Sequence, residues 1–138
     1  MIRTYIKKKI PKPSLFQRKD FIGHAGTNLS FKIECDSLTN EDIECIAYLI
    51  STKLTFSRVY GVPTGGLRLA KALQQYSTNL PTIFTKVLIV DDVFTTGRSM
   101  EVHRYATQYL HFGKAIGIVI FSRGICPSWI TPIFQLTL

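Results

Sequence analysis

Cysteine, long apolar runs and acidic residues are all scarce in this sequence, and each scarcity excludes a class of protein. The three cysteines, Cys35, Cys45 and Cys126, form no C-x-x-C pair. An odd cysteine count without a signal peptide disfavours a disulfide-stapled secreted domain and a thiolate metal site. No apolar run approaches the roughly 18 residues of a membrane-spanning helix. We therefore expect a cytoplasmic protein with reduced thiols and no membrane association.

Acidic residues number 9 against 17 Lys and Arg, which gives a formal net charge of +8. Such a surface attracts anions, including nucleotides, phosphosugars and nucleic acid. Much of the excess precedes the first acid, Asp20, where Pro11 and Pro13 interrupt any helix. We predict a basic arm over residues 1–19, which either contacts nucleic acid, a phosphate-rich ligand or a partner subunit, or is a solvated terminus. No aromatic-rich nucleic-acid signature accompanies it, so a nucleic-acid partner is disfavoured.

The remaining length and the residue pattern predict one α/β domain over residues 20–138. Of the 138 residues, 46% are hydrophobic, enough for a core that folds unaided. Period-two alternation predicts a sheet-edge strand over 29–35, and turn and N-cap residues at 36–40 precede an amphipathic helix that ends near Lys53. Further predicted elements are strands over 58–62, 87–90 and 115–121 and helices over 67–73 and from about 98 to 110, with a C-cap at Gly113.

The alternation of strands and helices predicts a single-domain α/β fold with a mainly parallel, twisted sheet flanked by helices. In such folds ligands bind at the carboxyl ends of the strands. Two conspicuous loops fall at predicted strand ends. We call residues 62–66 the glycine loop and residues 95–99 the hydroxyl loop.

The hydroxyl loop has the residues that a phosphate monoester needs. Closely spaced backbone N–H groups, small residues and hydroxyls can surround a dianion, and the following helix adds its positive N-terminal end. Arg98 adds charge or points to solvent. The residues predicted to bind the phosphate are Thr95, Thr96, Gly97, Arg98 and Ser99.

Asp91 and Asp92 lie between the apolar strand and the hydroxyl loop, where we expect the strand to stop. Two carboxylates facing a phosphate would repel it, but they can accept hydrogen bonds from sugar hydroxyls. An acid pair followed by a phosphate loop indicates phosphorylated ribose. An acid pair at a strand end, followed by an ordinary N-cap, is the alternative.

The whole segment 87–99, Val-Leu-Ile-Val-Asp-Asp-Val-Phe-Thr-Thr-Gly-Arg-Ser, closely resembles the signature of type I phosphoribosyltransferases. The resemblance implies that Asp91 and Asp92 act at the reacting sugar by binding the ribose hydroxyls of phosphoribosyl pyrophosphate. It also implies that residues 95–99 bind the 5-phosphate. No G-K-[ST] occurs, which excludes a Walker loop.

The glycine loop resembles the same family's pyrophosphate loop. On its own, a glycine-rich turn between a strand and a helix is more often a simple connecting turn. The resemblance implies that its N–H groups meet the leaving pyrophosphate and its Mg²⁺. Thr64 stands where many relatives carry a basic residue, and Arg58, Arg68 and Lys71 are candidates to replace that charge. The residues implied are Val62, Pro63, Thr64, Gly65 and Gly66.

Two further segments resemble, more loosely, the base-binding parts of orotate-type members of this family. Residues 24–31 resemble a segment in which a lysine and aromatics border the base, with His24 in the place of the lysine. Residues 121–124 resemble the strand-end arginine that faces orotate. His24, Phe31 and Arg123 are therefore candidate base-binding residues. Core or rim packing for the first two, and a surface turn for Arg123, are the alternatives.

One departure from the orotate-type pattern concerns the catalytic lysine. Those enzymes carry a long mobile loop with this lysine before the signature strand, whereas only residues 74–86 are present here. Lys86 precedes the strand too closely to act as a lid. Either the lysine comes from the basic arm or a second subunit of a homodimer, or the domain binds the ligand and transfers it poorly.

The sequence thus favours an enzyme of nucleotide metabolism that transfers ribosyl 5-phosphate from phosphoribosyl pyrophosphate to a nitrogenous base such as orotate or a related pyrimidine. Mg²⁺ would be held through the ligand's pyrophosphate and ribose oxygens, with no protein metal ligand. A non-catalytic sensor of phosphoribosyl pyrophosphate or of a nucleotide is the alternative. A nucleic-acid-binding protein of this composition is a third reading, ranked last.

Overall fold

The computed structural model describes residues 13–22, 28–81, 85–110 and 114–136, with the side chains of 19–22, 28–30 and 108–110 left out. The chain divides into two compact units, residues 1–37 and 38–138. The predicted boundary between arm and domain, at residues 19 and 20, lies inside a strand of the first unit. The division into a basic arm and a domain stays a prediction.

The first unit contains an antiparallel pair of strands, β1 (Phe16–Ile22) and β2 (Asn28–Ile33), followed by the 3-10 helix η1 (Cys35–Ser37). Phe16 is paired with Ile33, and the register shifts between Arg18 and Phe21. The strand predicted over 29–35 is therefore found as β2. It lies in this two-stranded sheet and not at the edge of the larger one.

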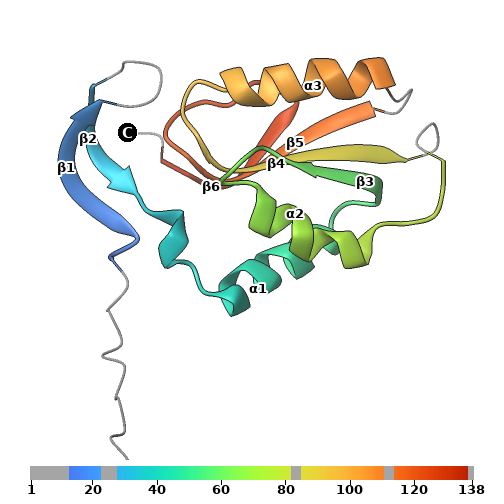
Figure 1. Ribbon diagram of the computed structural model, residues 1–138, viewed down its shortest axis with the longest axis horizontal. Helices are drawn as coiled ribbons and strands as arrows, with labels where there is room; N and C mark the ends of the chain where they lie inside the picture. Colours follow the sequence, from blue (N-terminus) through green and yellow to red (C-terminus); the bar gives the residue numbers. More distant parts are fainter. Residues whose placement is uncertain (1–12, 23–27, 82–84, 111–113, 137–138) are drawn as a thin grey trace, which may run out of the picture. The chain divides into compact units, whose positions relative to one another are not determined.

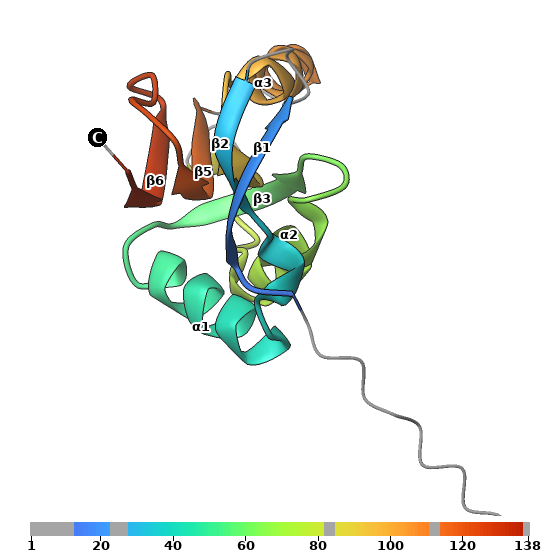
Figure 2. The same ribbon diagram turned by 90° about the vertical axis from the view of Figure 1, so that its left-hand side faces the viewer.

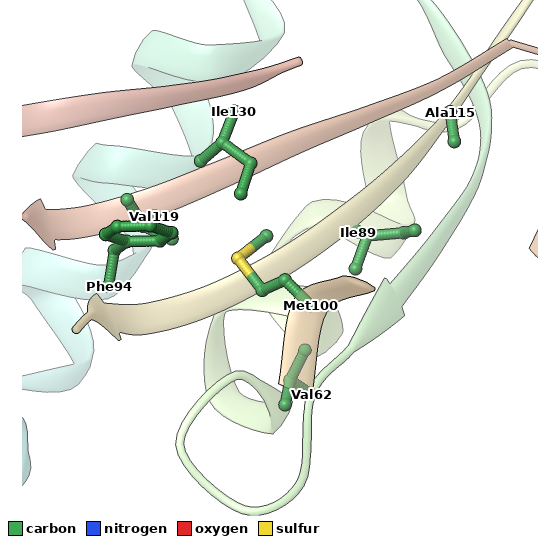
Figure 3. Packing of buried hydrophobic residues seen from close by; sticks show 7 residues of the cluster. All are labelled: Val62, Ile89, Phe94, Met100, Ala115, Val119 and Ile130. Atoms are coloured by element: carbon green, nitrogen blue, oxygen red, sulfur yellow. The ribbon is translucent and has the colours of Figure 1, made fainter. Parts of the chain in front are cut away.

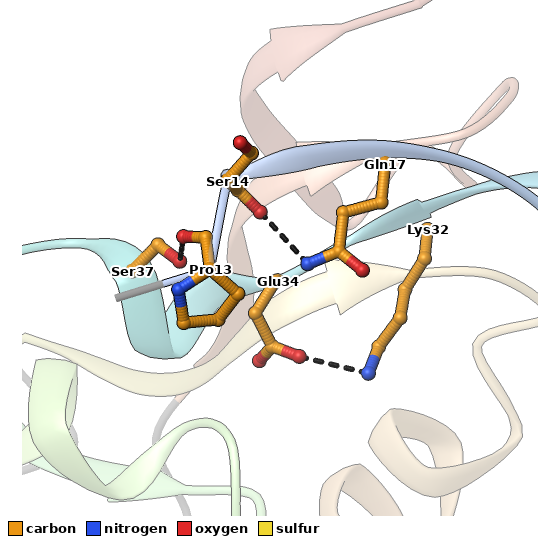
Figure 4. A network of polar contacts seen from close by, with 6 residues as sticks. All are labelled: Pro13, Ser14, Gln17, Lys32, Glu34 and Ser37. Atoms are coloured by element: carbon orange, nitrogen blue, oxygen red, sulfur yellow. Dashed lines mark hydrogen bonds and ion pairs between the residues drawn. The ribbon is translucent and has the colours of Figure 1, made fainter. Parts of the chain in front are cut away.

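Local polar contacts join the start of β1 to the end of β2 within this unit (Figure 4). The Ser37 hydroxyl donates to the carbonyl of Pro13. Lys32 Nζ lies 2.8 Å from Glu34 Oε2, and this pairing raises the pKa of the lysine and lowers that of the glutamate. Because both groups are partly exposed, the pair contributes little to stability.

The second unit is a four-stranded parallel sheet in the order β3-β4-β5-β6 with helices on both faces (Figure 1). Helices α1 and α2 cover one face, and α3 covers the other. The α/β fold with a parallel sheet flanked by helices, predicted from the sequence, is confirmed. The bounds are α1 (Asn40–Ser51), β3 (Phe56–Gly61), α2 (Leu67–Leu73), η2 (Gln74–Tyr76), β4 (Lys86–Phe94), α3 (Arg98–Leu110), β5 (Lys114–Ser122) and β6 (Ile130–Gln135).

Helix α1 begins with a capping box. The Asp42 N–H donates to Thr39 Oγ1 at 3.0 Å, and the Thr39 N–H donates to Asp42 Oδ2 at 2.8 Å. These bonds satisfy two of the N–H groups that a helix start leaves without intrahelical partners. The predicted apolar face is buried as expected and consists of Ile43, Ile46, Ala47 and Ile50.

A cluster of buried apolar side chains joins α3 to the sheet and to the glycine loop (Figure 3). Met100, which is 2% exposed, extends from the first turn of α3 toward the central strands. This packing fixes the start of α3 over the carboxyl half of the sheet. The members of the cluster are Val62, Ile89, Phe94, Met100, Ala115, Val119 and Ile130.

The return from β5 to β6 is short and contains no helix (Figure 2). The Gly117 N–H donates to the Trp129 carbonyl at 2.8 Å, and a Cβ at Gly117 would lie 2.9 Å from the Trp129 ring. Trp129 Nε1 also donates to Glu101 Oε1 of α3 at 2.7 Å. The close approach that glycine allows therefore lets the connection return beneath α3.

No helix in the described part of the chain is long and apolar enough to cross a membrane.

Candidate functional site

The two loops and the acid pair follow neighbouring strands at the carboxyl edge of the parallel sheet. The glycine loop follows β3, and the hydroxyl loop follows β4, which is the next strand in the sheet. The sequence predicted that β4 stops at the acids, but the strand continues to Phe94, with Asp91 in register with Val119 of β5. Pairing with β5 on this side outweighs the low strand propensity of aspartate.

Asp91 and Asp92 are both partly exposed, and each carboxylate accepts a hydrogen bond from the backbone N–H of the following residue. The Asp92 N–H donates to Asp91 Oδ1 at 2.8 Å, and the Val93 N–H donates to Asp92 Oδ1 at 2.7 Å. Burial, opposed by the hydrogen bond from the Asp92 N–H and reinforced by the neighbouring Asp92 carboxylate, raises the pKa of Asp91 to about 7. A buried carboxyl beside a second carboxylate keeps its proton to higher pH because both effects disfavour its charged form.

The hydroxyl loop is open to a ligand. Thr95, Thr96 and Ser99 are exposed, and α3 starts directly after Gly97. Gly97 has a φ of 76°, and its carbonyl accepts a hydrogen bond from the Glu101 N–H at 3.0 Å. Since the first N–H groups of a helix have no partner within it, they are available to a ligand, as are the exposed hydroxyls of this loop. This arrangement suits a dianion.

The glycine loop is held tightly by backbone hydrogen bonds. The Val62 N–H donates to the Val90 carbonyl at 2.8 Å, and the Gly66 N–H donates to the Val62 carbonyl at 2.8 Å. The peptide bond between Pro63 and Thr64 is cis. In the described part of the chain, the N–H groups of Thr64 and Gly65 have no hydrogen-bond partner, so the loop offers these two donors to a ligand.

The structure brings the glycine loop against the acid pair. A Cβ added at Gly65 would overlap the Asp92 carboxylate, so a side chain here would displace that group. Asp92 therefore lies where a ligand on the Thr64 and Gly65 donors would also meet the acid pair. This approach joins segments 27 residues apart, and spacing along the sequence did not reveal it.

Arg58, Arg68 and Lys71, the three candidates to replace the charge that Thr64 lacks, differ in how free their side chains are to reach the glycine loop. Arg68 Nη2 donates to the Leu38 carbonyl at 2.8 Å and to Asn40 Oδ1 at 3.2 Å, so Arg68 points toward the start of α1. Arg58 on β3 and Lys71 in the last turn of α2 are exposed. Arg68 is therefore the least suitable of the three to replace the charge that Thr64 lacks.

Arg123 immediately follows β5 at the same edge, and its N–H donates to the Phe94 carbonyl at 3.2 Å. Burial lowers the pKa of its guanidinium below the ordinary value. Phe31 lies on β2 in the other compact unit, and His24 lies outside the described residues. The structure thus places Arg123 beside the acid-bearing strand, while the base-binding roles of all three residues stay predictions.

The turn that carries Arg123 has anchors that the sequence did not reveal. Gln135 Nε2 of β6 donates to the Gly124 carbonyl at 2.8 Å, and Ser122 Oγ donates to the same carbonyl at 2.5 Å. Ser122 is 2% exposed. A short polar motif at the end of a buried strand, Ser-Arg-Gly, is a signal that could have suggested a fixed turn.

Lys86 lies at the opposite edge of the sheet from the acids. It is the first residue of β4 and pairs with Phe56, the first residue of β3. Five strand residues at about 3.3 Å each separate Lys86 from Asp91 by roughly 16 Å. The prediction that Lys86 does not act as a lid over the site is consistent with this position.

Among the described residues, no three His, Cys, Asp or Glu side chains gather into a group that could hold a metal ion. The acids at the carboxyl edge are Asp91 and Asp92. This donor set fits Mg²⁺ that arrives on a phosphorylated ligand and is coordinated by ligand oxygens, because Mg²⁺ keeps several waters and few protein contacts.

Comparisons with solved structures show the same fold. An orotate phosphoribosyltransferase from Aeropyrum pernix is 21% identical, with a TM-score of 0.69 over 88% of each chain. The Mycobacterium tuberculosis H37Rv orotate phosphoribosyltransferase in complex with phosphoribosyl pyrophosphate is 18% identical, with a TM-score of 0.59 over 75% of this chain and 80% of that one.

A purine phosphoribosyltransferase from Pyrococcus horikoshii Ot3 is 19% identical, with a TM-score of 0.53 over 72% of this chain and 84% of that one. No protein-family model and no curated protein sequence matches the chain. The chain therefore has the type I phosphoribosyltransferase fold, as the signature segment predicted, at an identity that shows the fold alone.

Proposed function

We propose that this chain is a phosphoribosyltransferase that binds phosphoribosyl pyrophosphate with Mg²⁺ and transfers its ribosyl 5-phosphate to a nitrogenous base. The observation that carries the proposal is the close approach of the Asp92 carboxylate to Gly65, where an added Cβ would overlap it. It places the Thr64 and Gly65 N–H donors beside Asp92, on the strand that leads through the hydroxyl loop into α3. Phosphoribosyl pyrophosphate has three parts, the pyrophosphate, the ribose and the 5-phosphate, and each requires one of these groups.

Each group has a separate task in this proposal. The hydroxyl loop, Thr95 to Ser99, binds the 5-phosphate at the start of α3 through N–H groups and hydroxyls. Asp91 and Asp92 accept hydrogen bonds from the ribose hydroxyls and do not act as nucleophiles. The glycine loop, residues 62–66, donates the Thr64 and Gly65 N–H groups to the pyrophosphate.

Bond breaking occurs at C1 of the ribose through an oxocarbenium-like transition state. The bond from C1 to pyrophosphate breaks with its electron pair on the leaving pyrophosphate, the base nitrogen bonds to C1, and the proton of that nitrogen passes to solvent. The acid pair and the two loops hold the sugar and the leaving group in line with the incoming base. Bound Mg²⁺ would neutralise charge on the leaving pyrophosphate. The negative acid pair near the sugar also favours the positive charge that develops on it.

The acceptor is placed by the turn that follows β5. The Arg123 guanidinium can pair with a planar anionic group through its fork of donors. Arg123 is fixed through its N–H bond to the Phe94 carbonyl, directly before the hydroxyl loop. These features support an anionic pyrimidine such as orotate over a neutral purine, with His24 and Phe31 as further candidate contacts.

A second candidate function is a sensor that binds phosphoribosyl pyrophosphate or a nucleotide without turnover. The observation that favours it is the connection between η2 and β4, which spans only residues 77–85 and leaves Lys86 at the far edge. Turnover would then require a lysine from the basic arm or from a second copy of the chain in a homodimer.

Pyrophosphate release distinguishes the two functions. The full chain is incubated with phosphoribosyl pyrophosphate, Mg²⁺ and a panel of bases including orotate, uracil and purines, and released pyrophosphate is measured. Release that needs both a base and an intact Asp92, lost in Asp92→Asn, supports the enzyme. Calorimetric binding without release supports the sensor, and no binding contradicts both.

A further inference from the structure

The turn after β5, residues 122–126, is held by the strands on both sides of it, and we call it the arginine turn. On the side of β4, the Arg123 N–H donates to the Phe94 carbonyl at 3.2 Å. On the side of β6, the Leu136 N–H donates to the Ser122 carbonyl at 3.0 Å. The backbone that carries Arg123 is therefore tied both to the strand with the acid pair and to the edge strand of the sheet.

The Ser122 hydroxyl joins the two ends of this turn. Ser122 is 2% exposed, and its Oγ donates to the Gly124 carbonyl at 2.5 Å. The same oxygen accepts hydrogen bonds from the Gly124 N–H at 3.3 Å and from Cys126 Sγ at 3.2 Å. A hydroxyl has one proton and two lone pairs, so these three bonds use its whole capacity. The hydroxyl of Ser122 thus shapes the turn and has no bond left for a ligand.

Gln135 supplies a second side-chain anchor, from β6. Its Nε2 donates to the Gly124 carbonyl at 2.8 Å. A carbonyl oxygen has two lone pairs, so the Gly124 carbonyl accepts from Gln135 and from Ser122 together. The end of β6 is also packed against β5, because Phe134 stacks on Phe121 with the ring centroids 5.4 Å apart. Gln135 therefore connects a strand end that is itself in place to the arginine turn.

Glycine does not impose this conformation. No atom lies within 4 Å of a Cβ added at Gly124, and the φ of Gly124 is not positive. The turn is therefore defined by its hydrogen bonds. A turn that loses one of them samples more conformations, and a ligand that needs one particular conformation then binds more weakly.

We propose that Ser122 and Gln135 are positioning residues for the acceptor, which hold the arginine turn so that the Arg123 guanidinium meets the carboxylate of an anionic pyrimidine. The inference rests on the proposed function, in which Arg123 pairs with a planar anionic group of the base. Neither Ser122 nor Gln135 contacts the ligand. They act by keeping Arg123 in one arrangement before the base arrives, because ordering it during binding would cost affinity.

The carboxylate of the base is the group through which this effect is measured. Orotidine 5-phosphate and uridine 5-phosphate share the ribose 5-phosphate and the pyrimidine ring, and they differ in this carboxylate alone. The ratio of their dissociation constants therefore reports the pairing with Arg123, and the contributions of the hydroxyl loop and the acid pair cancel. A general loss of structure would weaken both nucleotides together and leave the ratio unchanged.

The test is calorimetric titration of both nucleotides into the full chain, as wild type and as Gln135→Met, which keeps the side-chain length and removes the donor. Gln135 is substituted because it is exposed, whereas Ser122 is buried. We expect the variant to bind orotidine 5-phosphate about three- to tenfold more weakly and uridine 5-phosphate as the wild type does.

The matched control is Gln75→Met on η2. Gln75 is also exposed, and its Nε2 also donates to a backbone carbonyl, that of Ala72, at 3.1 Å. This substitution removes the same kind of hydrogen bond outside the arginine turn. We expect both nucleotides to bind the control variant as they bind the wild type, and a change of their ratio equal to that in Gln135→Met would overturn the proposal.

A double variant tests whether Gln135 acts through Arg123. Arg123→Ala should lower the preference for orotidine 5-phosphate about 10- to 100-fold. Adding Gln135→Met to it should change nothing further, because the two residues belong to one interaction. A further loss in the double variant, or an unchanged ratio in Gln135→Met alone, would contradict the positioning role.

The wild type separates the two levels of inference. If it binds neither nucleotide, the proposed function itself fails. If it binds both nucleotides equally well, the ribose 5-phosphate site stands, and the placement of an anionic base by the arginine turn is wrong. A preference for orotidine 5-phosphate that falls in Gln135→Met supports both.

Discussion

The glycine loop and the hydroxyl loop follow neighbouring strands at one edge of the sheet, yet they present opposite kinds of surface. The glycine loop is fixed by backbone hydrogen bonds, offers the Thr64 and Gly65 N–H groups and contains no cation. The hydroxyl loop exposes three hydroxyls, Arg98 and the start of α3. Because only the hydroxyl loop carries a cation, ligand affinity should come mainly from the 5-phosphate end, and the pyrophosphate end should contribute geometry more than charge.

The rigidity of the glycine loop gives the largest expected effect. A Cβ at Gly66 would overlap the Val90 carbonyl and lie 2.7 Å from the Val62 nitrogen, both of them backbone atoms. Gly66→Ala should therefore lower the free energy of unfolding by roughly 3 kcal/mol or more, because neither atom can move away cheaply. Chemical denaturation measures this change.

The matched control for that substitution is Gly124→Ala, because no atom lies within 4 Å of a Cβ at Gly124. We expect it to change the free energy of unfolding by about 0.5 kcal/mol or less. If the two variants unfolded at the same denaturant concentration, the glycine loop would not be more rigid than the hydroxyl loop.

The hydroxyl loop gives the next effect, on binding rather than on stability. Thr96→Ala removes an exposed hydroxyl that we expect to bond to phosphate, so the dissociation constant for ribose 5-phosphate should rise about 10- to 100-fold. Fluorescence or calorimetric titration measures it. Thr131→Ala, an exposed threonine at the amino end of β6, should leave the affinity unchanged.

A substitution in the glycine loop is the second control for this prediction. Thr64→Ala should leave the affinity for ribose 5-phosphate unchanged, because that ligand has no pyrophosphate group. An equal loss of ribose 5-phosphate affinity in Thr64→Ala and Thr96→Ala would contradict the division of tasks between the two loops.

The hydroxyl loop could be predicted from the sequence because its chemistry is contiguous. Two acids, two threonines, a glycine and a serine fall within residues 91–99, and α3 begins inside this segment, at Arg98. The start of α1 was predictable for the same reason, since Thr39 and Asp42 are three residues apart and form a capping box. Local patterns are predictable when the interacting groups are near one another in sequence.

The unpredicted parts depend on partners that are distant in sequence. β1 contains Gln17, Arg18, Lys19 and Asp20 in succession, so it shows no alternating pattern and forms through its pairing with β2. β6 contains Pro132, which an edge strand tolerates but which argues against a strand in the sequence. The approach of Gly65 to Asp92 likewise depends on the register of β3 and β4.

The third-largest expected effect comes from the acid pair between the two loops and concerns how the folding stability varies with pH. The pKa of Asp91 is raised to about 7 in the folded chain, from an ordinary value of 3.8. Between these values the folded state binds a proton that the unfolded state has lost, so stability falls as pH rises from about 4 to about 7. Because Asp91 is partly exposed, we expect the loss to be roughly 1–2 kcal/mol.

Asp91→Asn should remove this part of the pH dependence, because asparagine carries no titrating proton there. Thermal unfolding of the wild type and the variant at half-unit pH intervals measures the difference. The two curves should converge near pH 4 and separate toward pH 7, with the variant more stable at the higher pH. Parallel curves would mean that Asp91 titrates normally in the folded chain.

The smallest expected effect comes from giving the glycine loop the charge that it lacks. Thr64→Arg places a cation next to the Thr64 and Gly65 N–H groups, and we expect it to tighten binding of magnesium phosphoribosyl pyrophosphate about three- to tenfold. The gain should shrink as salt rises, because the side chain of residue 64 is exposed and its field is screened. Thr64→Gln separates charge from side-chain length. Equal affinities of the two variants would show that the pyrophosphate end is not limited by charge, and the asymmetry between the loops would then lie in their rigidity alone.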